Sequence, residues 1–317
     1  MKIIFLGTPE FAVASLQVLI ENKYDVVAVV TAPDQPAGRG LQLKQSAVKE
    51  FALQHQLKVI QPVKLSDPDF LAEVKQLNAG LQIVVAFRMM PQVLWSMPVL
   101  GTFNLHASLL PQYRGAAPIN RAVMNGETET GVTTFFLQQA IDTGNILFAE
   151  KVRIGEDETA GQLHDKLKEA GAALVLKTVK AIETKNYTEV PQNDLVNVEL
   201  KAAPKIFKDD CKLNFSKSVF ELYNQIRGLS PYPAAFFNLK TQGGKQEAIK
   251  IFRADSVADA NVVFKKEVWC DDKTFLKIQC NGGYLNVKEL QMAGKKRMLI
   301  DEFLRGYKMN GSEIVVS

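Results

Sequence analysis

Short apolar runs alternate with segments of helical periodicity in the first part of the chain, and this alternation leaves few possible folds. The apolar run KIIFL (2–6) leads through a turn into AVASLQVLIE (12–21), whose apolar spacing is helical, and then into the β-branched run YDVVAVV (24–30). A strand, a helix and a second strand in this order predict a right-handed crossover between parallel strands. The turn after the first strand contains Gly7 but no GxGxxG motif, so dinucleotide binding is only weakly indicated.

The same alternation continues through residue 183. A long helix is expected over 158–183, with Thr159 and Gln162 in the positions of a capping box. The pattern predicts an α/β fold, namely a Rossmann-like, doubly wound and mostly parallel sheet with helices on both faces. Further strands are expected at LQIVVAF (81–87), TFNLHA (102–107), TGVTTFFLQ (130–138) and NILFAEKVRI (145–154).

The pattern changes after residue 188. Residues 189–205 contain two prolines and no clear periodicity, which is typical of a linker. Beyond them, one expected helix (216–229) precedes short β-rich runs separated by Gly or charged turns, which predicts a small antiparallel β-barrel resembling an OB fold. We therefore expect a first domain at 1–188, a linker at 189–205 and a C-terminal domain at 206–317.

Charge is distributed unevenly along the 317 residues. Residues 1–200 contain 18 Lys and Arg against 21 Asp and Glu, whereas residues 201–317 contain 20 against 13, a net charge of +7. A basic C-terminal part suggests an anionic partner such as nucleic acid, although a solvated Lys-rich surface would give the same count. The densest basic runs are Lys295–Lys296–Arg297 and Lys265–Lys266.

Composition also limits the class of protein. No run of about 18 apolar residues is present, so no membrane partner is expected. The three Cys include no CxxC pair, which favours reduced thiols and a cytoplasmic location. The three His are scattered and lack ligand spacing relative to the Cys, so we expect no metal site. Nothing indicates an obligate dimer, and we expect a monomer.

The stretch FNLHASLLPQYRGAAP (103–118) contains the strongest chemical signal. Asn104 and His106 lie two residues apart on an expected strand, so they share a face near its carboxyl end, where α/β sheets bind ligands. An Asn amide can stabilise an oxyanion and a His can transfer a proton. Asp142, in an Asp-Thr-Gly turn between two expected strands, is the best partner for the imidazole. Taken singly, each residue could equally be structural.

The motifs around these residues resemble those of the folate-dependent formyltransferases. The resemblance lies in NLHASLLPQYRGAAPINRAV and TGVTTFFLQQAIDTGNIL, and it extends along the chain through MKIIFLGTPEFAVASLQVL, PDQPAGRG and AGKKRM. It is strongest to the members that act on initiator methionyl-tRNA. It implies transfer of the formyl group of 10-formyltetrahydrofolate to the methionyl amine, for translation initiation. It also implies that Asn104, His106 and Asp142 are catalytic and that the co-substrate lies against Ser108, Leu109, Leu110 and Pro111.

The resemblance also assigns basic residues to tRNA binding. Residues 33–46 read as an exposed loop with two prolines and two glycines, and Arg39 matches a basic residue that meets the tRNA acceptor end, with Lys44 assisting. Lys295, Lys296 and Arg297 are expected to contact phosphates. The aromatic residues Phe236, Phe237 and Trp269 could be taken for a base-stacking platform, but we expect them in the barrel core.

One departure from the family pattern follows the strand LQIVVAF. Arg88 stands where a Gly is more common, so the backbone beside the pterin pocket is in doubt, and Met89 and Met90 are expected to fill core space. Two other functions remain open from the residues. One is a folate-dependent formyltransferase of a small amine, and the other is a catalytically silent nucleic-acid-binding protein. The basic C-terminal part argues against the first, and the Asn-His-Asp set argues against the second.

Overall fold

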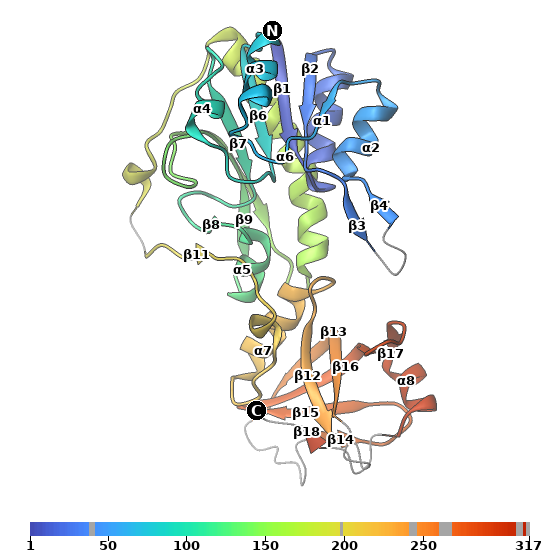
Figure 1. Ribbon diagram of the computed structural model, residues 1–317. Helices are drawn as coiled ribbons and strands as arrows, with labels where there is room; N and C mark the ends of the chain where they lie inside the picture. Colours follow the sequence, from blue (N-terminus) through green and yellow to red (C-terminus); the bar gives the residue numbers. More distant parts are fainter. Residues whose placement is uncertain (38–41, 197–198, 241–245, 260–267, 309–312, 315–317) are drawn as a thin grey trace. The chain divides into compact units, whose positions relative to one another are not determined.

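The computed structural model describes residues 1–37, 42–196, 199–240, 246–259, 268–308 and 313–314 (Figure 1). Its chain divides into two compact units. Unit 1 comprises residues 1–118, 129–153 and 164–203, and unit 2 comprises 119–128, 154–163 and 204–317. The domain limits expected from the sequence stay a prediction. Within the described residues, no helix is long and apolar enough to cross a membrane.

Unit 1 is built on a seven-stranded sheet in the order β10-β9-β7-β6-β1-β2-β5. The five strands from β7 to β5 in this order are parallel, whereas β9 pairs antiparallel with β7 and with β10. The mostly parallel sheet is therefore confirmed. Its strands are β1 (Lys2–Gly7), β2 (Asp25–Val30), β5 (Val59–Ile60), β6 (Leu81–Val85), β7 (Thr102–His106), β9 (Glu129–Phe136) and β10 (Ile146–Arg153).

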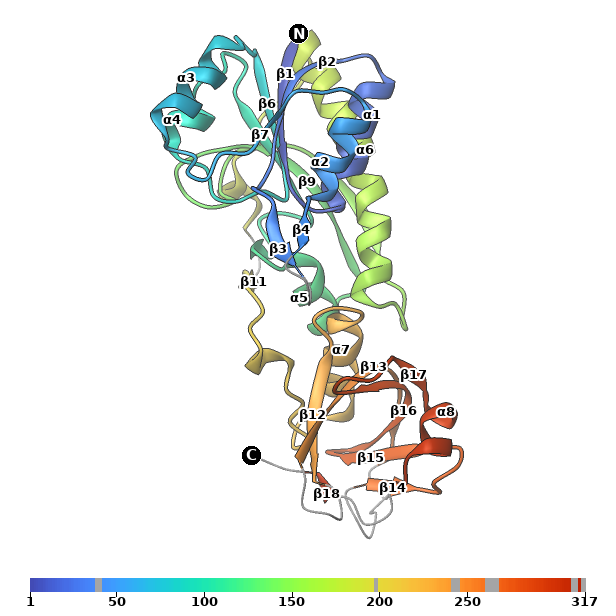
Figure 2. The same cartoon turned by 45° about the vertical axis from the view of Figure 1, so that its right-hand side comes forward.

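Helices cover both faces of this sheet. In Figure 2, α3 and α4 lie on one side of it, and α1, α2 and α6 lie on the other. Between the sheet and α3 and α4, apolar side chains such as Leu6, Val30 and Phe70 form one buried cluster. These helices are α1 (Phe11–Glu21), α2 (Ala47–Gln54), α3 (Pro68–Gln76), α4 (Gln92–Trp95) and α6 (Ala160–Thr184). All but the first residue of α5 (Pro118–Met124) belongs to unit 2.

Local sequence explains where several helices begin. The hydroxyl of Ser46 accepts a hydrogen bond from the Lys49 amide at the start of α2, and Asp67 caps α3 just before Pro68. The capping box expected for α6 is confirmed, because Gln162 Oε1 accepts from the Thr159 amide and Thr159 Oγ1 accepts from the Gln162 amide. The four-residue helix α4 was not predicted, since a single turn has no periodicity to detect.

Unit 2 contains α7 (Val219–Leu229) and an antiparallel sheet that forms a half-barrel, with β17 paired to β16. Its core includes Phe237, Leu285 and Phe303, while Phe236 is partly buried against it. The core expectation was wrong for Trp269, whose exposed fraction is 48%. The sheet elements and the last helix are β12 (Ala235–Lys240), β13 (Gln246–Ala258), β14 (Val268–Cys270), β15 (Leu276–Cys280), β16 (Gly283–Met292), β17 (Met298–Leu299), β18 (Glu313–Ile314) and α8 (Ile300–Gly306).

The loop expected at 33–46 contains a short hairpin of β3 (Gln35–Ala37) and β4 (Gln42–Lys44). Its two strands pair antiparallel, so backbone hydrogen bonds fix the base of the loop. Arg39 lies outside the described residues.

Most of the segment expected as a linker (189–205) belongs to unit 1, and it is held there by regular structure. A 3₁₀ helix occupies Gln192–Leu195, and β11 (Ala202–Ala203) pairs in parallel with β8 (Arg114–Gly115). Gly115 has a φ of +126° and a Cβ there would lie 2.5 Å from the Ala203 carbonyl oxygen, so this close pairing requires glycine. The segment therefore runs directly beside the FNLHASLLPQYRG stretch.

Candidate active site

The site is built around the carboxyl end of β7, which lies between β6 and β9 in the sheet. Asn104 is opposite Val84 of β6 and Phe135 of β9, and His106 is opposite Thr133. Because side chains alternate along a strand, Asn104 and His106 point to the same face. Asn104 Oδ1 is buried and has no hydrogen-bond partner among the described residues. Buried polar atoms are almost always bonded, so this atom makes Asn104 a candidate for contact with a ligand.

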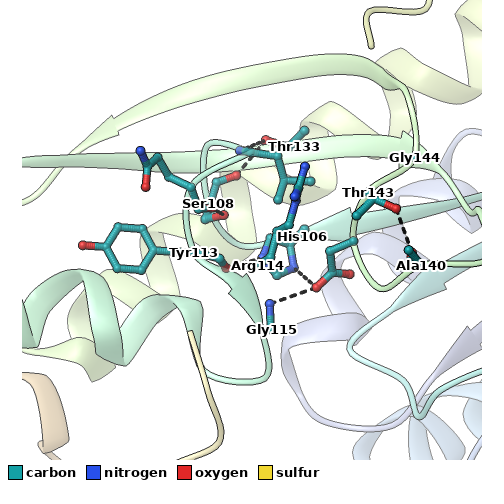
Figure 3. Close-up of polar contacts among 12 residues, drawn as sticks. His106, Ser108, Tyr113, Arg114, Gly115, Thr133, Ala140, Thr143 and Gly144 are labelled. Carbon is teal, nitrogen blue, oxygen red and sulfur yellow. Dashed lines mark hydrogen bonds and ion pairs between the residues drawn. The ribbon is translucent and has the colours of Figure 1, made fainter. Parts of the chain in front are cut away.

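The imidazole of His106 is buried, with 7% of its surface exposed, and both of its nitrogens have a neighbour. Nε2 lies 2.8 Å from the Tyr113 carbonyl oxygen, and Nδ1 lies 3.8 Å from Asp142 Oδ2 (Figure 3). A carbonyl oxygen can only accept, so Nε2 carries a proton and donates it. The neutral ring then has its basic lone pair on Nδ1, and a proton taken up there would face the Asp142 carboxylate.

Asp142 occupies the turn between β9 and β10 in a left-handed conformation, with φ of 54°. Asp tolerates this region better than most residues. The Gly115 amide donates a hydrogen bond of 3.0 Å to Asp142 Oδ2, which aims the carboxylate toward β8 and His106 (Figure 3). Two residues later the chain passes so close to β9 that a Cβ on Gly144 would lie 1.6 Å from the Phe136 carbonyl oxygen. Glycine is therefore required in this turn.

The SLLP segment is held by a hydroxyl that the sequence analysis missed. Thr133 Oγ1 donates to the Ser108 carbonyl at 2.7 Å and accepts from the Leu110 amide at 3.2 Å. Ser108 Oγ itself donates to the Gln112 carbonyl at 2.6 Å, so its hydroxyl serves the loop. Ser108, Leu110 and Pro111 are buried and Leu109 is partly exposed. The sequence signal for this role was the pair Thr133–Thr134 inside an apolar strand, because buried hydroxyl groups need hydrogen-bond partners.

Asn104, His106, Asp142 and the SLLP segment are thus brought together in unit 1, and the expected tRNA-binding cations belong to other elements of the chain. Lys44 is exposed on β4, and Lys295 and Lys296 are exposed beside β16 of unit 2. Among the described residues, neither of these two lysines has a carboxylate partner. Arg297 differs, because its guanidinium pairs with the Glu289 carboxylate and lies 4.3 Å from the centre of the Phe252 ring.

The structure explains how Arg88 is accommodated where a Gly is more common in the family. The guanidinium of Arg88 donates to the carbonyl oxygens of Pro62 and Val63, and burial lowers its pKa. The left-handed residue of this loop is Ala86, with φ of 48°, so the backbone does not need glycine at position 88. The core expectation is confirmed for Met90 and wrong for Met89, whose exposed fraction is 75%.

Comparison with known proteins places this geometry in a family. A model described as formyl transferase matches residues 1–179, and one described as formyl transferase, C-terminal domain, matches residues 205–308. A methionyl-tRNA formyltransferase of Flavobacterium johnsoniae is 51% identical over 306 residues, covering 96% of each chain. One of Bacteroides fragilis is 48% identical over 310 residues, covering 98% of this chain and 96% of that protein.

Solved structures show the same fold at lower identity. An N-formyltransferase from Helicobacter canadensis, in complex with folinic acid and dTDP-3-aminofucose, has a TM-score of 0.65 and 23% identity and covers 90% of this chain and 98% of that one. HypX from Aquifex aeolicus in complex with tetrahydrofolic acid has a TM-score of 0.62 and 18% identity, covering 98% of this chain and 48% of that one.

Proposed function

The chain belongs to the formyl transferase family, and we propose from this that it is a methionyl-tRNA formyltransferase. It transfers the formyl group of 10-formyltetrahydrofolate to the free amino group of methionyl initiator tRNA, which supplies N-formylmethionyl-tRNA for translation initiation. Relatives of that name match it at 48–51% identity over nearly the whole chain, including the C-terminal part. The observation that carries the chemistry is the convergence of Asn104, His106 and Asp142 at the end of β7.

The proposed reaction begins when the methionyl amine attacks the formyl carbon. A carbon–nitrogen bond forms and the formyl oxygen becomes negatively charged. Asn104 stabilises this oxyanion with a hydrogen bond donated by Nδ2. A rotation of its amide by 180° places Nδ2 where the unpartnered Oδ1 now lies. Collapse of the tetrahedral species breaks the bond to the folate nitrogen and releases tetrahydrofolate.

His106 moves the proton in this scheme. Nδ1 is its free basic nitrogen, since Nε2 is bound to the Tyr113 carbonyl. Nδ1 accepts the proton that the amine loses and returns it to the departing folate nitrogen. The Asp142 carboxylate, 3.8 Å from Nδ1, stabilises the imidazolium between these two transfers.

The remaining site residues have binding roles in this proposal. The loop Ser108–Leu109–Leu110–Pro111 forms an apolar wall for the folate, with its backbone fixed by Thr133. Arg39 and Lys44 engage the acceptor end of the tRNA. Lys295, Lys296 and Arg297 contact its phosphates. The two lysines contribute more than Arg297, because the Arg297 guanidinium already has an anionic partner. We also infer that the enzyme acts as a monomer in the cytoplasm.

The direct test is a formylation assay with 10-formyltetrahydrofolate and methionine-charged initiator or elongator tRNA, read out as acid-stable formylmethionine. We expect product with initiator tRNA and little with elongator tRNA. A His106→Ala variant with an intact fold should lose most turnover. Absence of product with both tRNAs would contradict the proposed function, and near-normal turnover of His106→Ala would contradict the assigned role.

A further inference from the structure

A buried amide lies behind the Asp142 turn and comes from the segment that the sequence predicted as a linker. The side chain of Gln192 is only 2% exposed. Its Nε2 donates hydrogen bonds of 2.8 Å to two carbonyl oxygens of the turn, those of Asp142 and Gly144. Its Oε1 accepts from Arg114, at 3.0 Å from Nε and 2.6 Å from Nη2. Every polar atom of this amide therefore has a partner.

These contacts close a ring around Asp142. Arg114 directs the amide of Gln192, and the amide binds the backbone of Asp142. The Gly115 amide, next in the chain after Arg114, binds the Asp142 carboxylate at 3.0 Å. The backbone of Asp142 is thus held by Gln192 and its side chain by Gly115, and Arg114 connects these two residues.

The Asp142 turn needs such support. Asp142 is in a left-handed conformation, which costs energy for any residue other than glycine. Its neighbour Ile141 is 59% exposed, so little apolar packing holds the turn from outside. Within the turn, Thr143 Oγ1 donates to the Ala140 carbonyl at 3.0 Å (Figure 3). The Asp142 and Gly144 carbonyls accept from Gln192 instead.

We propose that Gln192 is a positioning residue that sets the Asp142 carboxylate opposite His106 Nδ1. This inference rests on the proposed function, in which that carboxylate stabilises the imidazolium. A residue that orients a catalytic carboxylate affects the rate of the chemical step, because displacing that carboxylate by about 1 Å can lower the rate roughly 100-fold. Binding of folate and tRNA does not depend on it.

Gln192 can be tested because other contacts hold its segment in place. Val190 pairs with Ile146 through backbone hydrogen bonds of 2.8 and 2.9 Å, and β11 pairs with β8. Replacing one side chain leaves these bonds intact. Gln192→Glu keeps an acceptor for Arg114 but turns a carboxylate oxygen toward the two carbonyls. In Gln192→Leu, the new side chain is similar in size to that of Gln but has no hydrogen-bond donor and no charge.

A matched control lies on the same two segments. Asn145 Nδ2 donates to Glu189 Oε2 at 2.9 Å, which is an exposed bond between the turn region and the connecting segment. Glu189→Ala removes that bond without touching the Asp142 or Gly144 carbonyls. It therefore controls for any loosening of the segment.

We expect Gln192→Glu and Gln192→Leu to lower kcat for formyl transfer by about 10- to 100-fold, with KM for both substrates changed by less than about 3-fold. Glu189→Ala should match the unmodified protein. In an Asp142→Asn background, adding Gln192→Glu should lower kcat by less than about 3-fold further, because the group it positions is gone.

Three results would overturn the inference. Folded Gln192 variants with normal kcat would show that the amide does not act on the reaction. An increase in KM with unchanged kcat would mean that Gln192 acts in substrate binding. If the fold-losses in kcat of Gln192→Glu and Asp142→Asn multiplied fully in the double variant, the role of Gln192 would be purely structural. Lack of activity in the unmodified protein, by contrast, would contradict the proposed function itself.

Discussion

A single unpartnered atom distinguishes the side chains at the end of β7. Thr133, Ser108 and His106 all have hydrogen-bond partners there, whereas Asn104 Oδ1 is buried without one among the described residues. Folding gains nothing from such a group and pays its desolvation, commonly about 1–3 kcal/mol. Its presence is explained if the substrate supplies the partner. Asn104 is therefore the residue at which stability and activity should separate most clearly.

We expect Asn104→Ala to lower kcat by about 100- to 1,000-fold, which is the usual effect of removing an oxyanion donor. The thermal midpoint should not fall as it does for a typical buried residue, because no hydrogen bond of Oδ1 is lost. Turnover and differential scanning calorimetry measure the two quantities on one preparation. A loss below ten-fold, or a large drop in thermal midpoint, would contradict the oxyanion role.

At the scale of elements, one carboxylate connects the ends of β2, α2 and β5. Asp34, which follows β2, accepts 2.6 Å and 2.8 Å hydrogen bonds from Lys49 Nζ of α2 and from Gln61 Nε2, which follows β5. The hydrogen bonds from Lys49 and then Gln61 lower the pKa of this carboxyl below its usual value. The folded state therefore binds the proton of Asp34 more weakly than the unfolded state does.

This lowered pKa predicts a pH dependence of stability. The contribution of Asp34 is complete above the unfolded pKa of about 4 and is lost as the pH falls through the lower folded pKa. We expect Asp34→Asn to abolish this contribution, so its thermal midpoint should fall less steeply than that of the unmodified protein below about pH 4. Thermal unfolding at a series of pH values measures both slopes. Parallel curves would mean that the three elements are not coupled through Asp34.

For the whole molecule, the uneven charge of the chain predicts how tRNA binding responds to salt. The excess of positive charge lies in residues 201–317, and Lys295 and Lys296 are exposed there without a carboxylate partner among the described residues. Lys288 also belongs to this part but pairs with Asp255 at 2.7 Å. Equal charge removal at these positions should therefore have unequal effects.

We expect Lys295→Ala and Lys296→Ala each to reduce the slope of log affinity against log salt by about 1, since each phosphate contact releases roughly one counterion. Lys288→Ala changes the net charge equally and should leave the slope nearly unchanged. Filter binding of initiator tRNA at several salt concentrations measures this. Equal slopes for all three variants would show that only overall charge matters.

Periodicity and motif spacing were enough to predict the mostly parallel sheet, the capped α6 and the common face of Asn104 and His106. These features depend on residues within one strand or one helix turn, so local sequence contains them. The family motifs then connected Asp142 to the pair.

Tertiary structure alone decided which distant groups meet at the site. Arg114 and Gln192 are 78 positions apart, and no pattern in the sequence indicates that the expected linker returns to the Asp142 turn. The same holds for Thr133, which lies 25 positions from the Ser108 carbonyl that it binds in the SLLP loop. Contacts of this kind follow from strand order and chain path, which local composition does not encode.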